Sequence, residues 1–245
     1  MELVDDCMDA GAKPYYTAQV RRKLRHLLVR YLIRNLVMLI ITIKQGKEKS
    51  LLEERQPWIY ASAVERVDGR PQEKMTAGIT ALVHTSSGQF IARAAYNSKS
   101  QIRARIWSYE PDEPVDHALI KRRVKAAVAK RSGATTKPVV LVSGDEDNLS
   151  GLLVEWYGGI KGYLVCEFQA AGVEAWKVPI VQSLMAETGC KNVYERADAL
   201  LRKGEGLPVL SGVLAGDEPP DAIELTEKGV KFFIDIKTGR KDKFR

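Results

Sequence analysis

Alternating hydrophobic and polar positions predict closely spaced β-strands in the first half of the chain. Residues 79–84, 90–96 and 101–109 alternate in this way, and the segments between them, Ser-Ser-Gly-Gln and Asn-Ser-Lys-Ser, have turn compositions. The run at 36–44 is rich in Ile, Leu and Val and predicts a further strand, followed by Lys44, Lys47 and Lys49. Several short antiparallel strands in succession predict a small β-barrel or sandwich.

The clearest alternation is QIRARIW at 101–107. One face of this strand carries Ile102, Ala104 and Ile106, which predicts burial in a core. The other face carries Gln101, Arg103, Arg105 and Trp107. Two guanidinium groups beside an amide and an indole suit a polyanion with stackable bases, such as RNA. An ordinary solvated strand face with a partly buried tryptophan has the same pattern, so the strand alone leaves both interpretations open.

The second half of the chain alternates strands with helices. A helix is predicted from Asp116, as its cap, to Arg131. Its expected inner stripe is Ile120, Val124, Ala127 and Val128, and its expected outer side is Lys121, Arg122, Arg123, Lys125 and Lys130. A second helix is predicted at 173–187, with Pro179 either in its first turn or at a kink. Strands are predicted at 193–196 and 230–236, the last entered through a turn at 227–229.

A glycine cluster at 158–162 lies between the predicted strands 152–157 and 163–168. A nucleotide-binding loop requires a strand, a glycine turn and a following helix, and no helical pattern follows here. We therefore expect a β-hairpin.

These elements predict an α+β protein with a small β-barrel at 36–115, a basic helix and linker at 116–135, and a second α/β domain at 136–241. Residues 242–245 form a short tail. Within the extension at 1–35, residues 20–32 have the pattern of a basic amphipathic helix. This helix could rest on RNA, on an anionic membrane surface or on its neighbour, or be poorly ordered.

Charge favours an anionic partner. The chain has 38 Lys and Arg against 31 Asp and Glu, a net charge of +7, and between 93 and 131 ten basic residues stand against four acidic ones. Three widely spaced cysteines predict neither disulfides nor a zinc site, which fits a reducing cytoplasm. No apolar run reaches membrane-spanning length and no signal peptide is evident, so we expect a cytoplasmic protein with no membrane partner.

Catalytic and metal-binding residues are not evident in the pattern. Cys166 falls in an apolar strand and Cys190 follows a helix, so both are expected to be core residues rather than nucleophiles. The three histidines, His26, His84 and His117, have no second ligand at metal-binding spacing. The acidic run Asp145–Glu146–Asp147 is expected to be a solvated loop.

Four ordered segments carry a family resemblance. They are KQGKEKSLLEERQPWIYASAVERVDG at 44–69, GQFIARAAYNSKSQIRARIWSYEPDEPVD at 88–116, VYERADALLRKGEGL at 193–207 and GVKFFIDIKTGRK at 229–241. The first two resemble the PUA domain of the ribosomal RNA large-subunit methyltransferase I family. The last two resemble its central α/β domain and the strand that leads into its catalytic domain. Members of this family use S-adenosylmethionine to methylate C5 of a cytosine in large-subunit (23S) ribosomal RNA. The resemblance covers about residues 40 to 241 and implies a PUA-like barrel followed by the α/β domain.

The chain departs from the family pattern in three places. After KTGRK the family continues into a DQR motif and a Rossmann-type catalytic domain, whereas here the chain continues as Asp242–Arg245 and stops. The family's GESDGLPG-like motif is GDEDNLSG at 144–151, and the first 35 residues match nothing in the family. We therefore expect no catalytic residues, no S-adenosylmethionine bound by this chain, and no methyltransferase activity from the chain alone.

The function implied by the resemblance is that of the RNA-binding portion of a ribosomal RNA methyltransferase. The candidate RNA-binding residues are Lys47, Lys49, Arg93, Lys99, Gln101, Arg103, Arg105 and Trp107. The alternative is a stand-alone PUA-type RNA-binding or adaptor protein. The sequence leaves open whether the chain forms a homodimer or meets a separate catalytic partner.

Overall fold

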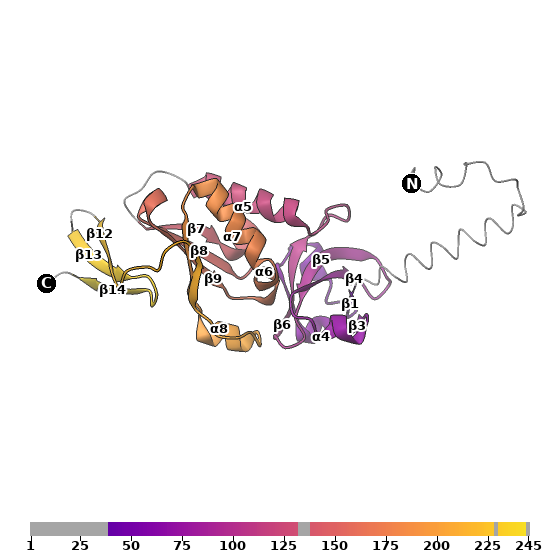
Figure 1. The fold of residues 1–245 in the computed structure, drawn as a ribbon. Helices are drawn as coiled ribbons and strands as arrows, with labels where there is room; N and C mark the ends of the chain where they lie inside the picture. Colours follow the sequence, from indigo (N-terminus) through magenta and orange to yellow (C-terminus); the bar gives the residue numbers. More distant parts are fainter. Residues whose placement is uncertain (1–38, 132–137, 228–229, 244–245) are drawn as a thin grey trace, which may run out of the picture. The chain divides into compact units, whose positions relative to one another are not determined.

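The computed structural model describes residues 39–131, 138–227 and 230–243, which form one compact unit. The amphipathic pattern at 20–32, most of the linker and the centre of the turn at 227–229 lie outside these residues. The described residues form sheets of six, five and three strands, here called the barrel sheet, the central sheet and the third sheet (Figure 1). The predicted α+β class is confirmed.

The barrel sheet has the strand order β2-β6-β5-β4-β1-β3, in which only β1 and β4 run parallel. Its strands are β1 (Leu39–Ile43), β2 (Trp58–Tyr60), β3 (Val64–Asp68), β4 (Ile79–His84), β5 (Phe90–Tyr96) and β6 (Ile102–Ser108). The edge strands β2 and β3 are joined by the 3₁₀-helix η1 (Ala61–Ala63) alone. Because so short a connection joins opposite edges, the sheet must curl into a half-barrel.

The concave face of the barrel sheet holds the first core. Leu39, Ile41 and Ile43 of β1 are fully buried there, together with Ala104 and Ile106 from the predicted inner face of β6. Two short helices, α3 (Lys49–Leu52) and α4 (Pro71–Met75), complete this part of the chain.

The central sheet has the order β11-β10-β9-β8-β7, with β9 and β10 parallel and the other neighbours antiparallel. Its strands are β7 (Val139–Ser143), β8 (Leu152–Tyr157), β9 (Tyr163–Phe168), β10 (Asn192–Glu195) and β11 (Gly212–Ala215). The β8–β9 hairpin is confirmed, and its turn is built by Gly158 and Gly159, both at positive φ. Such φ values favour glycine. The geometry of the turn therefore accounts for the glycine cluster, and no nucleotide-binding role is needed to explain it.

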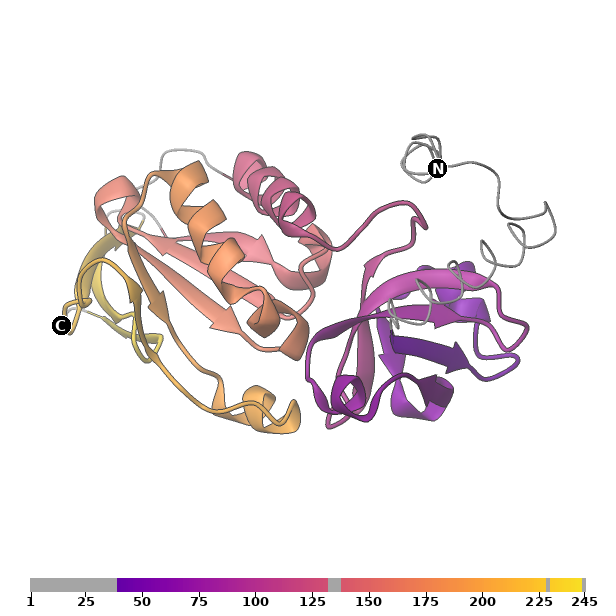
Figure 2. The ribbon, with the colours of Figure 1, turned by 45° about the vertical axis from the view of Figure 1, so that its right-hand side comes forward.

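Helices α5 (His117–Arg131) and α7 (Lys177–Thr188) lie side by side on one face of the central sheet (Figures 1 and 2). The helix expected at 173–187 is two helices, since α6 (Ala171–Ala175) ends at Trp176 before α7 begins. Pro179 lies in the first turn of α7, where its missing N–H leaves no hydrogen bond unmade. Arg123, expected on the outer side of α5, instead turns inward over the ring of Trp107.

The third sheet packs against part of the opposite face of the central sheet. Its strands are β12 (Ile223–Glu227), β13 (Val230–Asp235) and β14 (Arg240–Lys243). Phe232 and Ile234 pack against Tyr157 and Val165. Tyr157 and Val165 alternate along β8 and β9 with residues of the helix-covered core, as the two-residue period of a strand requires.

Candidate functional site

The buried carboxylate of Glu205 joins the barrel sheet to the helices of the central sheet. Its Oε1 accepts hydrogen bonds from Ser100 Oγ (2.7 Å) and Arg105 Nη2 (3.2 Å), and its Oε2 accepts from Asn97 Nδ2 (3.0 Å) and the Ala171 N–H (3.3 Å). The side chain of Glu205 is only 7% exposed. A carboxylate is tolerated at such a buried position because all these donors replace the lost water.

Arg105 and Trp107 were expected on a solvent-exposed face of β6, but that face is not open to solvent at these two residues. Trp107 is 4% exposed and belongs to the core of the central sheet, where its ring lies beside Gly172 of α6. Arg105 reaches Glu205 and also donates to Ser150 Oγ at 3.3 Å. The expected exposure of these two residues is therefore wrong, because the second domain packs on the face that alternation assigns to the outside.

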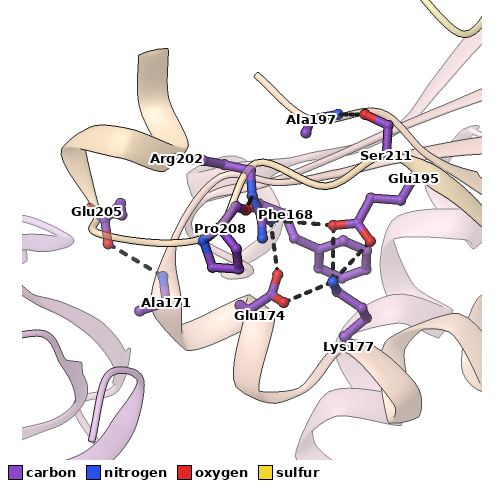
Figure 3. A network of polar contacts seen from close by, with 10 residues as sticks. All are labelled: Phe168, Ala171, Glu174, Lys177, Glu195, Ala197, Arg202, Glu205, Pro208 and Ser211. Atoms are coloured by element: carbon purple, nitrogen blue, oxygen red, sulfur yellow. Dashed lines mark hydrogen bonds and ion pairs between the residues drawn. The ribbon is translucent and has the colours of Figure 1, made fainter. Parts of the chain in front are cut away.

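A second buried network lies under helix α8 (Ala199–Gly204) (Figure 3). Arg202, 1% exposed, donates from Nη1 to Phe168 O, Glu174 Oε2 and Glu195 Oε1 at 2.7, 2.9 and 3.3 Å. Lys177 Nζ adds ion pairs to Glu174 (2.8 Å) and Glu195 (2.9 Å). This network fixes α8 against β9 and β10, and thereby holds Glu205 in place.

These networks give VYERADALLRKGEGL its structural role. Glu195, Arg202 and Glu205 all belong to it. So does Arg196, which bridges Glu167 Oε1 (2.7 Å) and Glu155 Oε2 (2.5 Å) and donates to Ile236 O beyond β13. Although burial lowers the pKa of Arg196, hydrogen bonds to the two carboxylates outweigh it and raise the pKa further above its ordinary range. The motif is thus a framework that connects the sheets.

The segment GDEDNLSG is only partly the solvated loop that was expected. Asp147 is buried and accepts from Arg131 Nη1 (2.7 Å), Lys130 Nζ (3.1 Å) and the Ser143 N–H (2.8 Å). Asp145 faces the barrel sheet, where its Oδ1 accepts a hydrogen bond from Trp58 Nε1 at 3.3 Å.

Other predicted residues gather around η1. The Ala61 N–H donates to Gln101 O (2.9 Å), and the Lys44 N–H donates to Ala63 O (2.9 Å). One short helix therefore brings the loop after β1 next to the β5–β6 turn, although these segments are far apart in sequence. We call the polar side chains of these two segments the basic rim, and they are Lys44, Lys47, Lys49, Lys99, Gln101 and Arg103.

Most side chains of the basic rim are exposed. Lys49 makes one ion pair, with the exposed Glu53 at 3.7 Å. Arg103 is half-buried and braces the β5–β6 turn by donating to Asn97 O (3.3 Å) and Ser98 O. Lys44 was not among the predicted site residues, although its place in KQGKEK was a signal for it. Arg93 lies at the opposite end of β5 and β6, where it donates to Pro111 O at 2.8 Å.

Beside the basic rim lies a cleft of about 710 Å³ between the barrel sheet, the central sheet and α8. Gln101 belongs to both the rim and the cleft. The remaining lining includes Trp58, Ile102, Arg105, Asp145, Glu146, Leu152, Gln169, Leu200, Leu201 and Glu205.

The cysteines of the described residues, Cys166 and Cys190, are free and buried, and burial raises the pKa of both thiols. A buried, protonated thiol is a poor nucleophile. Within residues 39–131, 138–227 and 230–243, no group of three or more His, Cys, Asp or Glu side chains is placed to hold a metal ion. Among the same residues, no helix is long and apolar enough to cross a membrane.

Comparison with known proteins identifies the barrel sheet. Residues 41–109 match the family model of the PUA-like domain. The chain is 35% identical over 210 residues to ribosomal RNA large subunit methyltransferase I of Aliivibrio fischeri, and 37% identical over 210 residues to that of Aeromonas salmonicida. Each match covers 83% of this chain and 50% of the relative. The chain thus spans about half the length of the curated relatives it matches.

Solved structures share the fold. A Streptococcus mutans protein assigned as a SAM-dependent methyltransferase aligns with a TM-score of 0.65 at 13% identity, over 84% of this chain and 51% of its own. The methyltransferase SMU.776 complexed with SAH aligns with a TM-score of 0.65 at 14% identity, over 83% of this chain and 49% of its own. The predicted resemblance is confirmed: the chain carries a PUA-like domain followed by an α/β domain, and over most of its length it is related to the ribosomal RNA large subunit methyltransferase I proteins.

Proposed function

We propose that the chain binds ribosomal RNA, and that the basic rim is where the RNA backbone docks. The observation that carries this proposal is that η1 joins two distant, lysine-bearing segments of the PUA-like domain. Lys44 Nζ donates to Ser62 O at 2.9 Å, and the Ala61 N–H donates to Gln101 O, two residues after the exposed Lys99. Lys and Arg contacts to phosphates supply most of the affinity of such surfaces. The relatives, which are ribosomal RNA methyltransferases, support ribosomal RNA as the partner.

Not all of the predicted residues take the same part in this proposal. Lys47, Lys49, Lys99 and Gln101 remain exposed and serve as direct contacts, while Arg103 shapes the turn that presents Lys99. Arg105 and Trp107 act as positioning residues, because their side chains join the barrel sheet to the second domain. Arg93 lies outside the basic rim, and we assign it no contact there.

The enzyme class follows from the relatives and is part of the proposal. We place this chain as the RNA-docking portion of an S-adenosylmethionine-dependent methyltransferase acting on a cytosine C5 in 23S ribosomal RNA, in the cytoplasm. About half of each relative lies outside the match, and we assign methyl transfer and the binding of S-adenosylmethionine to that half.

The test is a titration of single-stranded RNA at several salt concentrations. Replacing Lys47 and Lys99 by Ala should reduce the slope of log affinity against log salt by about 1.4, since each lost phosphate contact on a single strand contributes ~0.7. Lys121 and Lys125, exposed on α5, provide the matched double-alanine control, with the same loss of charge. An unchanged slope in the rim variant, with a reduced slope in the α5 variant, would move the RNA surface to α5.

A further inference from the structure

The cleft beside the basic rim is unsuited to a phosphate. Its charged lining consists of Asp145, Glu146 and Glu205 against Arg105, and the guanidinium of Arg105 is already paired with Glu205 at 3.2 Å. The lining therefore carries net negative charge and repels an RNA backbone. Whatever part of an RNA enters this cleft must be neutral.

The size and apolar lining of the cleft suit a planar ring. Its volume of about 710 Å³ lies within the range of ~300–1,000 Å³ typical of small-molecule sites. Trp58 is held by hydrogen bonds from its indole N–H to Asp145 Oδ1 and Ser150 Oγ, both 3.3 Å, so the edge of the ring is fixed, and the half-buried ring lines the cleft. On the α8 side, Leu200 and Leu201 are 81% and 44% exposed and add apolar surface.

Hydrogen-bond acceptors dominate the polar lining. One oxygen of each nearby carboxylate is already used, Asp145 Oδ1 by Trp58 and Glu146 Oε2 by Arg131, both at 3.3 Å, and the second oxygen of each can accept. Gln169 uses its amide N–H on Glu167 at 2.8 Å, which leaves its carbonyl oxygen as an acceptor. Acceptors select a ring edge that carries donors. The exocyclic amino groups of adenine, cytosine and guanine are such donors, whereas uracil offers only its ring N3–H, and the carboxylates would repel the two carbonyl oxygens that flank it.

The position of the cleft relative to the basic rim completes the argument. Gln101 belongs to both, and its neighbours Ser100 and Ile102 also line the cleft. A strand whose phosphates follow the rim therefore passes the mouth of the cleft. Proteins that read single-stranded RNA commonly take an unstacked base out of the strand and stack it on an aromatic ring.

We propose that this cleft binds one unpaired, amino-bearing nucleobase of the RNA, with the base stacked on Trp58 and its amino group donating to the carboxylates of the 144–147 segment. The proposal rests on the proposed function, because the basic rim must first hold the strand. It adds base selectivity to a surface that would otherwise bind any RNA backbone.

The test compares RNA octamers that differ at one position. Octa-uridine is the reference, and one central uridine is replaced by adenosine, by cytidine or by an abasic site. We expect adenosine or cytidine to tighten binding about tenfold relative to uridine, an effect of the size that one hydrogen bond from the amino group to a carboxylate provides. Glu146→Gln should reduce this preference to less than about threefold and leave the affinity for octa-uridine unchanged. Trp58→Ala should weaken the binding of every octamer that carries a base at the central position, because stacking on an aromatic ring does not depend on which base is stacked.

The outcomes separate the cleft from the basic rim. Equal affinities for all octamers, with the rim's salt dependence intact, overturn the base-binding cleft and leave the proposed function standing. If no octamer binds, both the base-binding cleft and the proposed RNA-binding function are wrong. Should Trp58→Ala fail to fold, as judged by circular dichroism, Glu146→Gln tests the base-binding cleft by itself, because the Glu146 side chain is exposed. Binding of a lysine- and leucine-rich peptide that depends on Trp58, without any base preference, also overturns the proposal and assigns the cleft to a protein partner.

Discussion

Glu205 is the residue on which the contact between the two domains depends most. It receives hydrogen bonds from a β-turn, a β-strand and a helix N-terminus, and its partner Arg105 is only 17% exposed on its side chain. Burying two charges is unfavourable in itself, so the pair persists because each group has several hydrogen-bond partners. Removal of the carboxylate leaves Arg105, Asn97 and Ser100 without their common acceptor.

We predict that Glu205→Ala lowers the free energy of unfolding by about 3 to 5 kcal/mol, the usual cost of leaving one member of a buried ion pair alone. Urea denaturation followed by circular dichroism measures this loss. Glu53→Ala is the control, because it breaks an exposed pair with Lys49 and should change stability by no more than about 0.5 kcal/mol. A loss below about 1 kcal/mol for Glu205→Ala would show that the network does not hold the domains together.

Asp147 makes the stability of the protein depend on pH. Burial alone would raise the pKa of Asp147, but hydrogen bonds from the Ser143 N–H, Arg131 and Lys130 outweigh burial and hold the pKa below its ordinary value. Because the pKa is lower in the folded protein, the stabilisation is complete above the unfolded value of about 3.9 and is lost as the pH falls through the folded value.

The corresponding prediction concerns Asp147→Asn. At pH 7 the variant should unfold at a lower urea concentration than the wild type, because Arg131 and Lys130 lose a buried carboxylate. Below about pH 4 the difference should shrink as the wild-type carboxylate takes up a proton. Urea midpoints measured between pH 3 and pH 7 test this, and a constant difference across that range would contradict it.

At the scale of elements, strands bounded by clear turn sequences were predictable from sequence. The residues of β4, β5, β8 and β9 were predicted with their observed bounds, because hydrophobic alternation and turn composition agree there. Short elements such as α4 and β11 have too few residues to show a period. The break at Trp176 was not predicted, although Pro179 was a signal for it, because a proline in the first turn requires the helix to begin just before it.

The candidate site was harder to predict than the strands. A polar strand face has the same sequence pattern whether it meets water or a second domain, so the half-buried Arg105 and the exposed Gln101 could not be distinguished. Trp107 was the available signal, because a large aromatic residue on a supposedly exposed strand face indicates that another part of the protein packs against that face. The gathering of Lys44 and Lys47 beside Gln101 depends on η1 closing the barrel, a three-dimensional relation that no local pattern contains.

Helix α6 lies close against the barrel sheet at Gly78, where a side chain has no room. Gly78 has φ +82°, and a Cβ there would overlap the carbonyl oxygen of Ala171. Gly88 has a similar φ of +87° with no atom within 4 Å of the corresponding position. The two glycines therefore share backbone strain and differ in crowding.

We predict that Gly88→Ala costs about 1 to 2 kcal/mol, the penalty of a left-handed conformation, whereas Gly78→Ala costs roughly 3 kcal/mol or more because it also pushes α6 from the sheet. Thermal and urea unfolding of the two variants give the comparison. Equal losses would mean that the contact between α6 and the barrel sheet yields freely, in disagreement with the close packing seen here.

At the scale of the whole molecule, the two domains share a core. Ala95 and Trp107 come from the barrel sheet, yet they pack in the same cluster as Phe168 and Val173 of the second domain. Buried apolar area shared in this way makes the folding of one domain favour the folding of the other. An independent RNA-binding module on a flexible tether would lack such a core. The chain therefore presents the basic rim and the cleft in one fixed geometry.

This shared core predicts a single cooperative unfolding transition for the described residues. Differential scanning calorimetry of the full chain should show one main peak, with calorimetric and van't Hoff enthalpies in agreement. Trp107→Ala combined with Arg105→Ala removes both the apolar and the polar link, and we expect that peak to separate into two, with the barrel domain melting first because its core is smaller. Ile160→Ala is the matched control, since Ile160 is 65% exposed and remote from the contact in the β8–β9 turn, and it should leave one peak. Two peaks in the wild type would show that the domains fold independently, and the fixed relation between the basic rim and the cleft would then have to come from bound RNA.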